Sequence, residues 1–308
     1  MNRAVIVSVV GVFAGLGLGL GPVLAQDAAK PPAAPREADP VERLVAAMRA
    51  AEEAATSLRV VLKTQGQLPS GLAVTTEGTL RVLRGTQPQD PPMLHSVVSY
   101  GFGDGLRGLV ESSQTQNGIE IYEDNPAFGE VLVHLPAEVV TDLQWAGKVL
   151  DRADLPGMAD RRAEAPLGSR MVDDLRRQFA LVIGPEGKRG ADAGVWLRGD
   201  RRAKVADLDP ELPLADRVEL FVRSKDHALL EVVHKQGDKV VQHIVVTELV
   251  VGEPLEPKDL RVDGRGQRVR EVQQYLPLWE QIEEVLTKAE SKADAGAGKE
   301  GLRPSKRK

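Results

Sequence analysis

The sequence predicts an α+β fold, in which helices cover one antiparallel sheet. Three observations lead to this prediction. A strand meander occupies the last third of the chain, six shorter β-rich runs come before it, and amphipathic helical stripes lie before and between the two groups. Short strands joined by tight polar turns pair with their sequence neighbours, which makes the sheet antiparallel.

The meander lies within Val218–Asp263 and is the clearest pattern in the chain. Apolar and polar residues alternate along its first run, as expected for a strand with one buried face. The linkers between the runs are short and polar, and one of them contains Gly237, a residue that accepts the positive φ of a tight turn. The three expected strands are Val218–Arg223, Leu229–Lys235 and Val240–Val251.

The N-terminal segment Met1–Ala25 has the layout of a secretory signal peptide. Arg3 gives it a basic start, a glycine-interrupted apolar run follows, and small-enough residues precede Gln26, as at a cleavage site. An uncleaved membrane anchor remains the alternative, because the apolar run nearly reaches spanning length. We expect cleavage near Ala25 and a periplasmic location.

A linker and a helix follow the signal segment. Residues 26–39 are rich in Pro and Ala without an apolar period, which predicts a flexible linker. Asp39 can cap a helix, Pro40 suits its first position, and Glu42 can complete a capping box. Apolar residues then recur at helical spacing as far as Leu58.

Six candidate strands, two helices and two further strands lead up to the meander. The six strands are expected at Leu58–Gln67, Leu72–Arg84, Met93–Tyr100, Arg107–Ser113, Ile119–Glu123 and Gly129–His134. The helices are expected at Pro136–Asp151 and Leu167–Gln178, with a charged Pro- and Gly-bearing loop between them as a possible hinge or a plain surface loop. The two further strands are Phe179–Ile183 and Gly194–Leu197, with residues 185–194 between them as a polar turn and a charged loop over Arg198–Pro213.

The C-terminal end carries a helical stripe and a basic tail. Apolar residues at helical spacing predict a helix over residues 266–288, with Glu284 and Lys288 placed for an ion pair. The composition of residues 289–308 predicts a disordered tail, with four basic residues among the last six. Such a tail is most often solvated, but a weak contact with an anionic membrane is the alternative.

Two stretches resemble the LolA-like superfamily of periplasmic lipoprotein carriers. The first is the hairpin KQGDKVVQHIVVTEL with its closure PLEPKDLRV, in which Leu260 stands where the family usually has Phe. The second is EGTLRVLRG, which is similar to a family strand through Gly78, Leu80, Val82 and Arg84 but lacks the Pro-Gly-Lys-Phe-Arg that follows there. The family's functional arginine is therefore not carried over. The order of elements over residues 40–265 also matches, so this range is the expected LolA-like domain.

The resemblance implies a non-catalytic carrier for a lipid or the acyl chain of a lipoprotein, without a cofactor. It also implies that the antiparallel sheet is strongly curved and forms an open half-barrel with helices on its concave side. The helices would cover an apolar cavity, and the expected lining residues are Leu80, Val82, Leu220, Val222, Val232 and Val245. A one-residue error in strand phase would turn each set to the other face. The alternative is an envelope sensor or scaffold module that uses the same fold to bind a protein partner.

Other classes of function lack support in the sequence. The chain has no Cys, which removes disulfides and thiolate zinc sites, and its net charge of −5 is the opposite of a basic nucleic-acid-binding domain. None of the five histidines has metal-ligand spacing, and no Ser lies in a G-x-S-x-G elbow. The glycine-rich residues 101–108 lack the Lys-Ser/Thr and helix of a phosphate loop, and Asp207, Asp209 and Glu211 offer too few ligands for calcium. We therefore expect neither catalysis nor a metal site.

Overall fold

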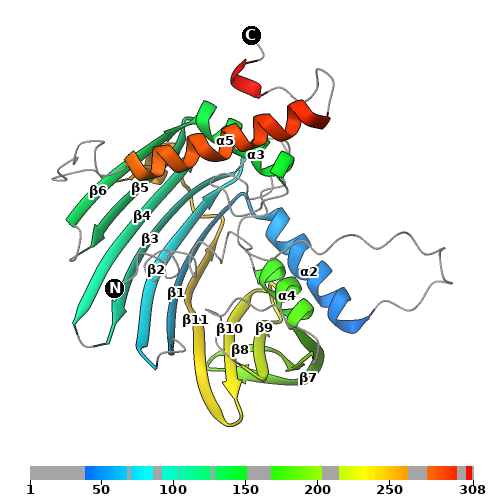
Figure 1. Ribbon diagram of the computed structural model, residues 1–308. Coiled ribbons are helices and arrows are strands. Elements are labelled where there is room, and N and C mark those ends of the chain that lie inside the picture. Colours follow the sequence, from blue (N-terminus) through cyan, green and yellow to red (C-terminus); the bar gives the residue numbers. More distant parts are fainter. Residues whose placement is uncertain are drawn as a thin grey trace.

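One antiparallel sheet of 11 strands organises the molecule (Figure 1). The computed structural model describes residues 39–67, 71–85, 92–103, 105–125, 129–150, 168–202, 215–262, 276–296 and 303–306. The strand order is β6-β5-β4-β3-β2-β1-β11-β10-β9-β8-β7, and every neighbouring pair is antiparallel. Strands β6 and β7 lie at the two ends of this order, so the sheet is not closed. The predicted α+β class with one open antiparallel sheet is thus confirmed.

The first six strands form one continuous meander, and all six predicted runs are confirmed within about two residues at each end. Each strand pairs with the next along the chain. The observed strands are β1 (Ser57–Gln67), β2 (Ala73–Leu83), β3 (Met93–Phe102), β4 (Leu106–Thr115), β5 (Gly118–Asn125) and β6 (Gly129–Pro136).

The last five strands form a second meander, and the three strands predicted after Val218 are confirmed. The predicted polar turn over residues 185–194 is wrong, because β7 continues to Arg189, β8 begins at Asp192, and only two residues turn the chain. Trp196 packs against Gly184 and Gly187 there, which gives this polar stretch a partner in the sheet. The five strands are β7 (Phe179–Arg189), β8 (Asp192–Arg201), β9 (Arg217–Arg223), β10 (Leu229–Gln236) and β11 (Lys239–Val251).

The predicted charged loop over Arg198–Pro213 also begins too early. Strand β8 keeps its pairing with β7 and β9 as far as Arg201 and Asp200, respectively. Residues 203–214 lie outside the described part of the chain, and so do Asp207, Asp209 and Glu211.

The two meanders are joined by pairing between the first strand and the last. Strands β1 and β11 are in register from Leu58 opposite Val251 to Gly66 opposite Gln242. A bulge at Thr247 interrupts the register, because Val61 pairs with Glu248 whereas Leu62 pairs with Val246. This long-range pairing makes the two halves one sheet, and it brings strands from both ends of the chain to the centre.

Four α-helices lie among the described residues, in two pairs at opposite ends of the sheet (Figure 1). Helices α2 and α4 lie beside β7–β10, and α3 and α5 cross the end that carries β5 and β6. Asp39 caps α2 by accepting a hydrogen bond from the Val41 N–H, and Pro40 takes the first position, as predicted. The helices are α2 (Pro40–Ala54), α3 (Ala137–Leu150), α4 (Gly168–Gln178) and α5 (Leu276–Gly296), with 3₁₀ turns η1 (Pro257–Leu260) and η4 (Pro304–Lys306).

Both helix pairs cover the same face of the sheet, which we call the inner face. The strand register places Leu58, Val82, Leu94, Ile119 and Leu135 in one row on this face. The row ends in a buried cluster with α3 and α5. A second row ends in the cluster with α2 and α4 and consists of Thr64, Ile244, Val232, Leu220 and Leu197. Thr64 and Leu58 are an even number of residues apart on β1, so the two rows lie on the same face of the sheet.

The C-terminal helix extends beyond its predicted end at Lys288. Helix α5 runs to Gly296, so the prediction of a disordered tail from Ala289 is wrong for its first eight residues. Ala289 and Ala293 are buried, and this packing holds a segment whose composition alone suggests disorder. Arg303–Lys306 is also described, and the Arg303 guanidinium bonds to Asp142 of α3 (Nε to Oδ2, 2.6 Å). The signal segment 1–25 and nearly all of the linker lie outside the described residues.

No helix in the described ranges has the length and apolar character needed to cross a membrane.

Candidate functional site

An apolar cavity of about 170 Å³ lies on the inner face, where the two meanders meet. Its floor comes from β1, β2, β10 and β11, and its roof from the C-terminal end of α2 and the start of α4. A turn between β9 and β10 closes one side. The apolar lining consists of Ala51, Ala55, Leu58, Val60, Leu62, Val82, Met171, Ala228, Leu229, Leu230, Val232, Ile244, Val246, Leu249 and Val251.

The bulge in β11 decides which residues of that strand line the cavity. Before Thr247 the lining residues are Ile244 and Val246, and after it they are Leu249 and Val251. The inserted residue shifts the alternation by one, so the two apolar pairs point to the same side although their spacing breaks the period of two. A strand without this bulge would turn Leu249 away from the cavity.

Two of the six residues expected to line a cavity do so. Val82 of β2 and Val232 of β10 both contribute to its floor. Leu80 lies two residues before Val82 on the same face and packs into the adjoining cluster of Leu58 and Val82. The prediction that these strands present apolar residues toward the helices therefore agrees with their placement.

Like Leu80, the other three expected residues do not line the cavity. Leu220 and Val222 are 0% and 1% exposed and belong to the packed core under α2 and α4. Val245 lies between the lining residues Ile244 and Val246 and points to the opposite face, beside Lys63 and Glu231 in the register. The physical reason is that β11 is apolar on both faces near this point, so composition alone does not fix its phase.

Sequence reasoning missed the contributions of β1 and of the two helices to the cavity. Leu58, Val60 and Leu62 alternate along β1, and this period-two signal could have identified them. The helix residues Ala51 and Met171 come together with them only through tertiary packing, for which the sequence carries no local sign.

A half-buried carboxylate connects the two roof helices at the cavity wall. Glu52, near the end of α2, accepts hydrogen bonds from the backbone N–H (3.0 Å) and the hydroxyl of Ser169, in the first turn of α4. Burial raises the pKa of Glu52, and the hydrogen bonds from Ser169 and the charges of Arg84 and Arg49 oppose this shift. Arg84 donates to the Glu52 carbonyl (3.0 Å), so the chain leaving β2 is held to the same corner.

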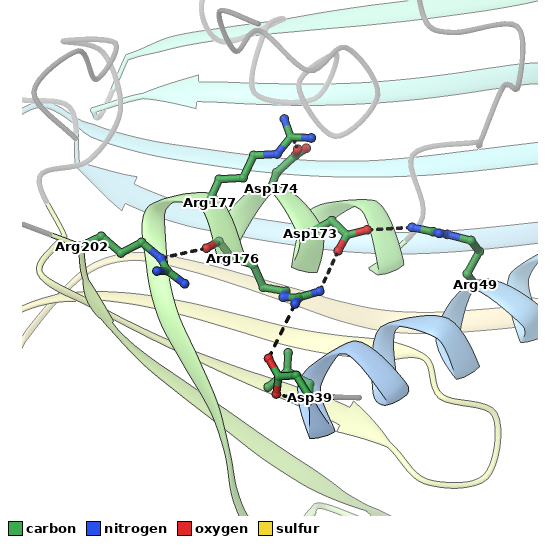
Figure 2. A network of polar contacts seen from close by, with 8 residues as sticks. Asp39, Arg49, Asp173, Asp174, Arg176, Arg177 and Arg202 are labelled. Carbon is green, nitrogen blue, oxygen red and sulfur yellow. Dashed lines mark hydrogen bonds and ion pairs between the residues drawn. The ribbon is translucent and has the colours of Figure 1, made fainter. Parts of the chain in front are cut away.

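Ion pairs join the same two helices along their outer side (Figure 2). Asp173 of α4 accepts from Arg49 of α2 at 2.7 Å and from Arg176 of its own helix at 3.4 Å. Arg176 also lies 3.7 Å from Asp39, the cap of α2. Together with the Glu52–Ser169 contact, these pairs make α2 and α4 a single unit over the cavity, which we call the roof pair.

The described residues hold no group of three His, Asp or Glu side chains placed to bind a metal ion. His234 and His243, which flank the β10–β11 turn, point to opposite faces. His243 contacts Glu231 (Nε2 to Oε1, 2.6 Å), whereas His234 lies beside the Phe179 ring in the inner core. The chemistry that the cavity offers is mainly apolar contact. The polar and charged residues at its wall are Glu52, Ser57, Arg84, Asp226, His227 and Glu231.

No family model matches the chain, and no curated protein matches it. Several solved structures do match. One is an uncharacterized conserved protein from Thermus thermophilus (12% identity, TM-score 0.35, covering 75% of this chain and 99% of that one). Another is MucB in the MucA/MucB complex from Pseudomonas aeruginosa (12% identity, TM-score 0.39, covering 75% of this chain and 63% of that one). A third is a LolA superfamily protein from Nitrosomonas europaea (7% identity, TM-score 0.23, covering 72% of this chain and 97% of that one). A LolA superfamily protein is thus among the solved structures to which this chain is similar.

Proposed function

We propose that the protein is a non-catalytic binding or carrier protein that holds an acyl chain of a lipid or lipoprotein in the cavity beneath the roof pair. The observation that supports this proposal is the apolar character of the cavity wall, to which both meanders and both roof helices contribute. Apolar surface removed from water stabilises a complex by about 25 cal/mol per Å². An acyl chain offers such surface without needing polar partners.

The size of the cavity indicates how such a ligand would enter. A closed apolar cavity of about 150 Å³ is known to hold one benzene molecule. The cavity of about 170 Å³ therefore accommodates only part of an acyl chain while the roof pair is in place. Binding of a longer stretch requires α2 and α4 to move away from β1 and β10, so that contacts with the ligand replace contacts with the helices.

The layout of residues 1–25 as a signal peptide supports a periplasmic site of action. The ligand would then be an envelope lipid or the acylated end of a lipoprotein. The basic C-terminal tail has less positive charge available for contact with a membrane than its composition suggests, because Arg303 is paired with Asp142 and Glu290.

Native mass spectrometry of the mature protein from its own envelope fraction tests the proposal. Val246 lines the cavity, and Val246→Phe fills part of it with an apolar ring, whereas Val245→Phe makes the same change on the opposite face of the strand. We expect a bound lipid or lipopeptide mass on the wild-type protein and on Val245→Phe, and its loss or strong reduction on Val246→Phe. Circular dichroism confirms that both variants are folded.

A wild-type protein that carries no lipid and takes up none from added phospholipid would contradict the carrier proposal. Equal lipid occupancy in the two variants would place the ligand elsewhere. The first of these results would favour the protein-binding alternative. Strand β7 is a free edge on which Val182 and Ile183 are 60% and 40% exposed, and such an edge is where a partner strand could pair.

A further inference from the structure

A second cleft, of about 520 Å³, lies on the outer face of the sheet, opposite the roof pair and the acyl-chain cavity. Strands β2, β3 and β4 form its floor, and the chain that follows β11 forms its wall. Its charged and titratable lining residues are Arg81, His95, Glu111, Lys258, Asp259 and Arg261. We call it the outer cleft, and its lining is polar where that of the inner cavity is apolar.

A row of basic side chains crosses the floor of the outer cleft. The register places Arg59, Arg81 and His95 directly opposite one another on β1, β2 and β3. Arg59 is neutralised by Glu248 at 2.7 Å and Glu253 at 3.0 Å, and His95 Nε2 lies 2.7 Å from Glu111 Oε1. Arg81, in the middle, forms no hydrogen bond or ion pair with any residue that the structure describes. Arg81 is thus the member of this row without an acidic partner among the described residues, and its guanidinium is available to bind an anion.

The wall brings further positive charge to the same place. Leu260 of η1 is fully buried, and its carbonyl accepts a hydrogen bond from the Ser113 hydroxyl of β4. This anchor holds Lys258 and Arg261, on either side of Leu260, at the rim of the cleft. Lys258 contacts Glu256 at 2.6 Å in an exposed pair, whereas Arg261 has no such partner among the described residues.

The acidic residues of the outer cleft are already occupied by internal contacts. Glu111 is 7% exposed and accepts from the buried His95, and the Asp259 carboxylate accepts from the backbone N–H of Glu256 (2.8 Å). The two guanidinium groups of Arg81 and Arg261 are therefore the groups left to bind a ligand. Each can donate two parallel hydrogen bonds to one anion, and phosphate oxygens match this geometry.

We propose that the outer cleft binds a phosphate group, with Arg81 on the floor and Arg261 on the wall as its main donors. The group is either a free phosphate or the headgroup of a phospholipid, since both present the same oxygens. The inference does not depend on the acyl-chain proposal, because the outer cleft and the inner cavity lie on opposite faces of the sheet and share no lining residue.

Two titrations of the full mature protein test this proposal and separate the two sources. Isothermal calorimetry with inorganic phosphate measures binding of the free ion, and co-flotation with vesicles of phosphatidylcholine and phosphatidic acid measures binding of the headgroup. We expect Arg81→Gln and Arg261→Gln each to weaken the binding about tenfold or more, and the double variant to abolish it. Arg81→Lys keeps the charge but loses the paired donors, so its binding should lie between those of the wild type and Arg81→Gln.

Arg198→Gln is the matched control, because Arg198 lies on β8 in the second meander, half exposed, with only a 3.9 Å contact to Glu219. This variant should bind like the wild type, and so should Val246→Phe, which alters only the inner cavity. Binding in the vesicle experiment alone identifies a lipid headgroup, and binding in calorimetry identifies a free phosphate. The proposal is overturned if neither probe binds, or if folded Arg81→Gln and Arg261→Gln bind as tightly as Arg198→Gln.

Discussion

At the scale of single residues, His234 shows how burial in the inner core keeps an ionisable side chain uncharged. Its ring lies 6.1 Å from the Phe179 ring, and its Nδ1 is buried without a hydrogen-bond partner among the described residues. Burial, together with the nearby charge of Arg201, lowers the pKa of His234 from 6.5 to about 4. The folded protein therefore keeps this imidazole neutral where an unfolded chain would protonate it.

The lowered pKa of His234 predicts a loss of stability in mild acid. Between pH 6.5 and about 4 the unfolded chain binds a proton at this residue and the folded chain does not, so the free energy of unfolding falls as the pH falls. The slope from one such group is about 1.4 kcal/mol per pH unit. The free energy of unfolding, measured by urea denaturation at several pH values in this range, should fall less steeply with pH for His234→Gln than for the wild type. His134→Gln, at a half-exposed side chain, is the control, and parallel curves for wild type and His234→Gln would contradict the assignment.

At the scale of secondary-structure elements, the roof pair depends on a small number of polar contacts. Asp173 is shared by Arg49 and Arg176, and Glu52 holds the first turn of α4. The Arg49 side chain is 43% exposed, so each ion pair contributes little to global stability. Such contacts hold helices in position but allow them to separate, which is what a displaceable roof requires.

Removing Asp173 should therefore loosen the roof pair without unfolding the protein. We expect Asp173→Ala to lower the free energy of unfolding by less than about 1 kcal/mol and to speed hydrogen exchange in α2, because α2 and α4 lose their shared ion pairs. Bound lipid should also leave faster. Asp174→Ala is the control, since among the described residues Asp174 forms an ion pair with Arg177 of the same helix, at 3.7 Å, and none with α2. Equal exchange rates in α2 for the two variants would mean that the ion pairs do not hold the roof.

The secondary-structure elements also show how much of the structure could be predicted from the sequence. Period-two and helical patterns identified all eleven strands and four helices, since burial on one face leaves that pattern directly in the residues. They did not identify the phase of β11, where Ile244, Val245 and Val246 are all apolar and Thr247 forms a bulge. They also ended α5 too early, because Ala289 and Ala293 are buried by tertiary contacts that composition does not reveal. Of the six residues named from the sequence, Val82 and Val232 line the cavity, whereas the other four lie elsewhere.

At the scale of the whole molecule, one sheet carries two hydrophobic cores that are covered by helices, with two smaller apolar clusters elsewhere on the sheet. One cluster combines α2 and α4 with β7–β11, and the other combines α3 and α5 with β5 and β6. The C-terminal segment belongs to the second core, where the side chain of Asp142 is 2% exposed and accepts from Arg303 and from the backbone N–H of Ser305. Since the two cores share no residue among those that the structure describes, a disturbance at one end need not reach the other.

Arg303→Ala tests this separation, because it leaves the buried Asp142 without its cationic partner. We expect a loss of about 2 kcal/mol in stability, less than for a fully buried pair because the Arg303 side chain is 25% exposed. Hydrogen exchange should rise in α3, α5, β5 and β6 and stay unchanged in β9 and β10. Asp142→Asn in the Arg303→Ala background should restore part of the loss by removing the unpaired charge. Lys288→Ala breaks an exposed pair on α5 and serves as the control. An equal rise of exchange in both cores would show instead that the sheet couples them into one cooperative unit.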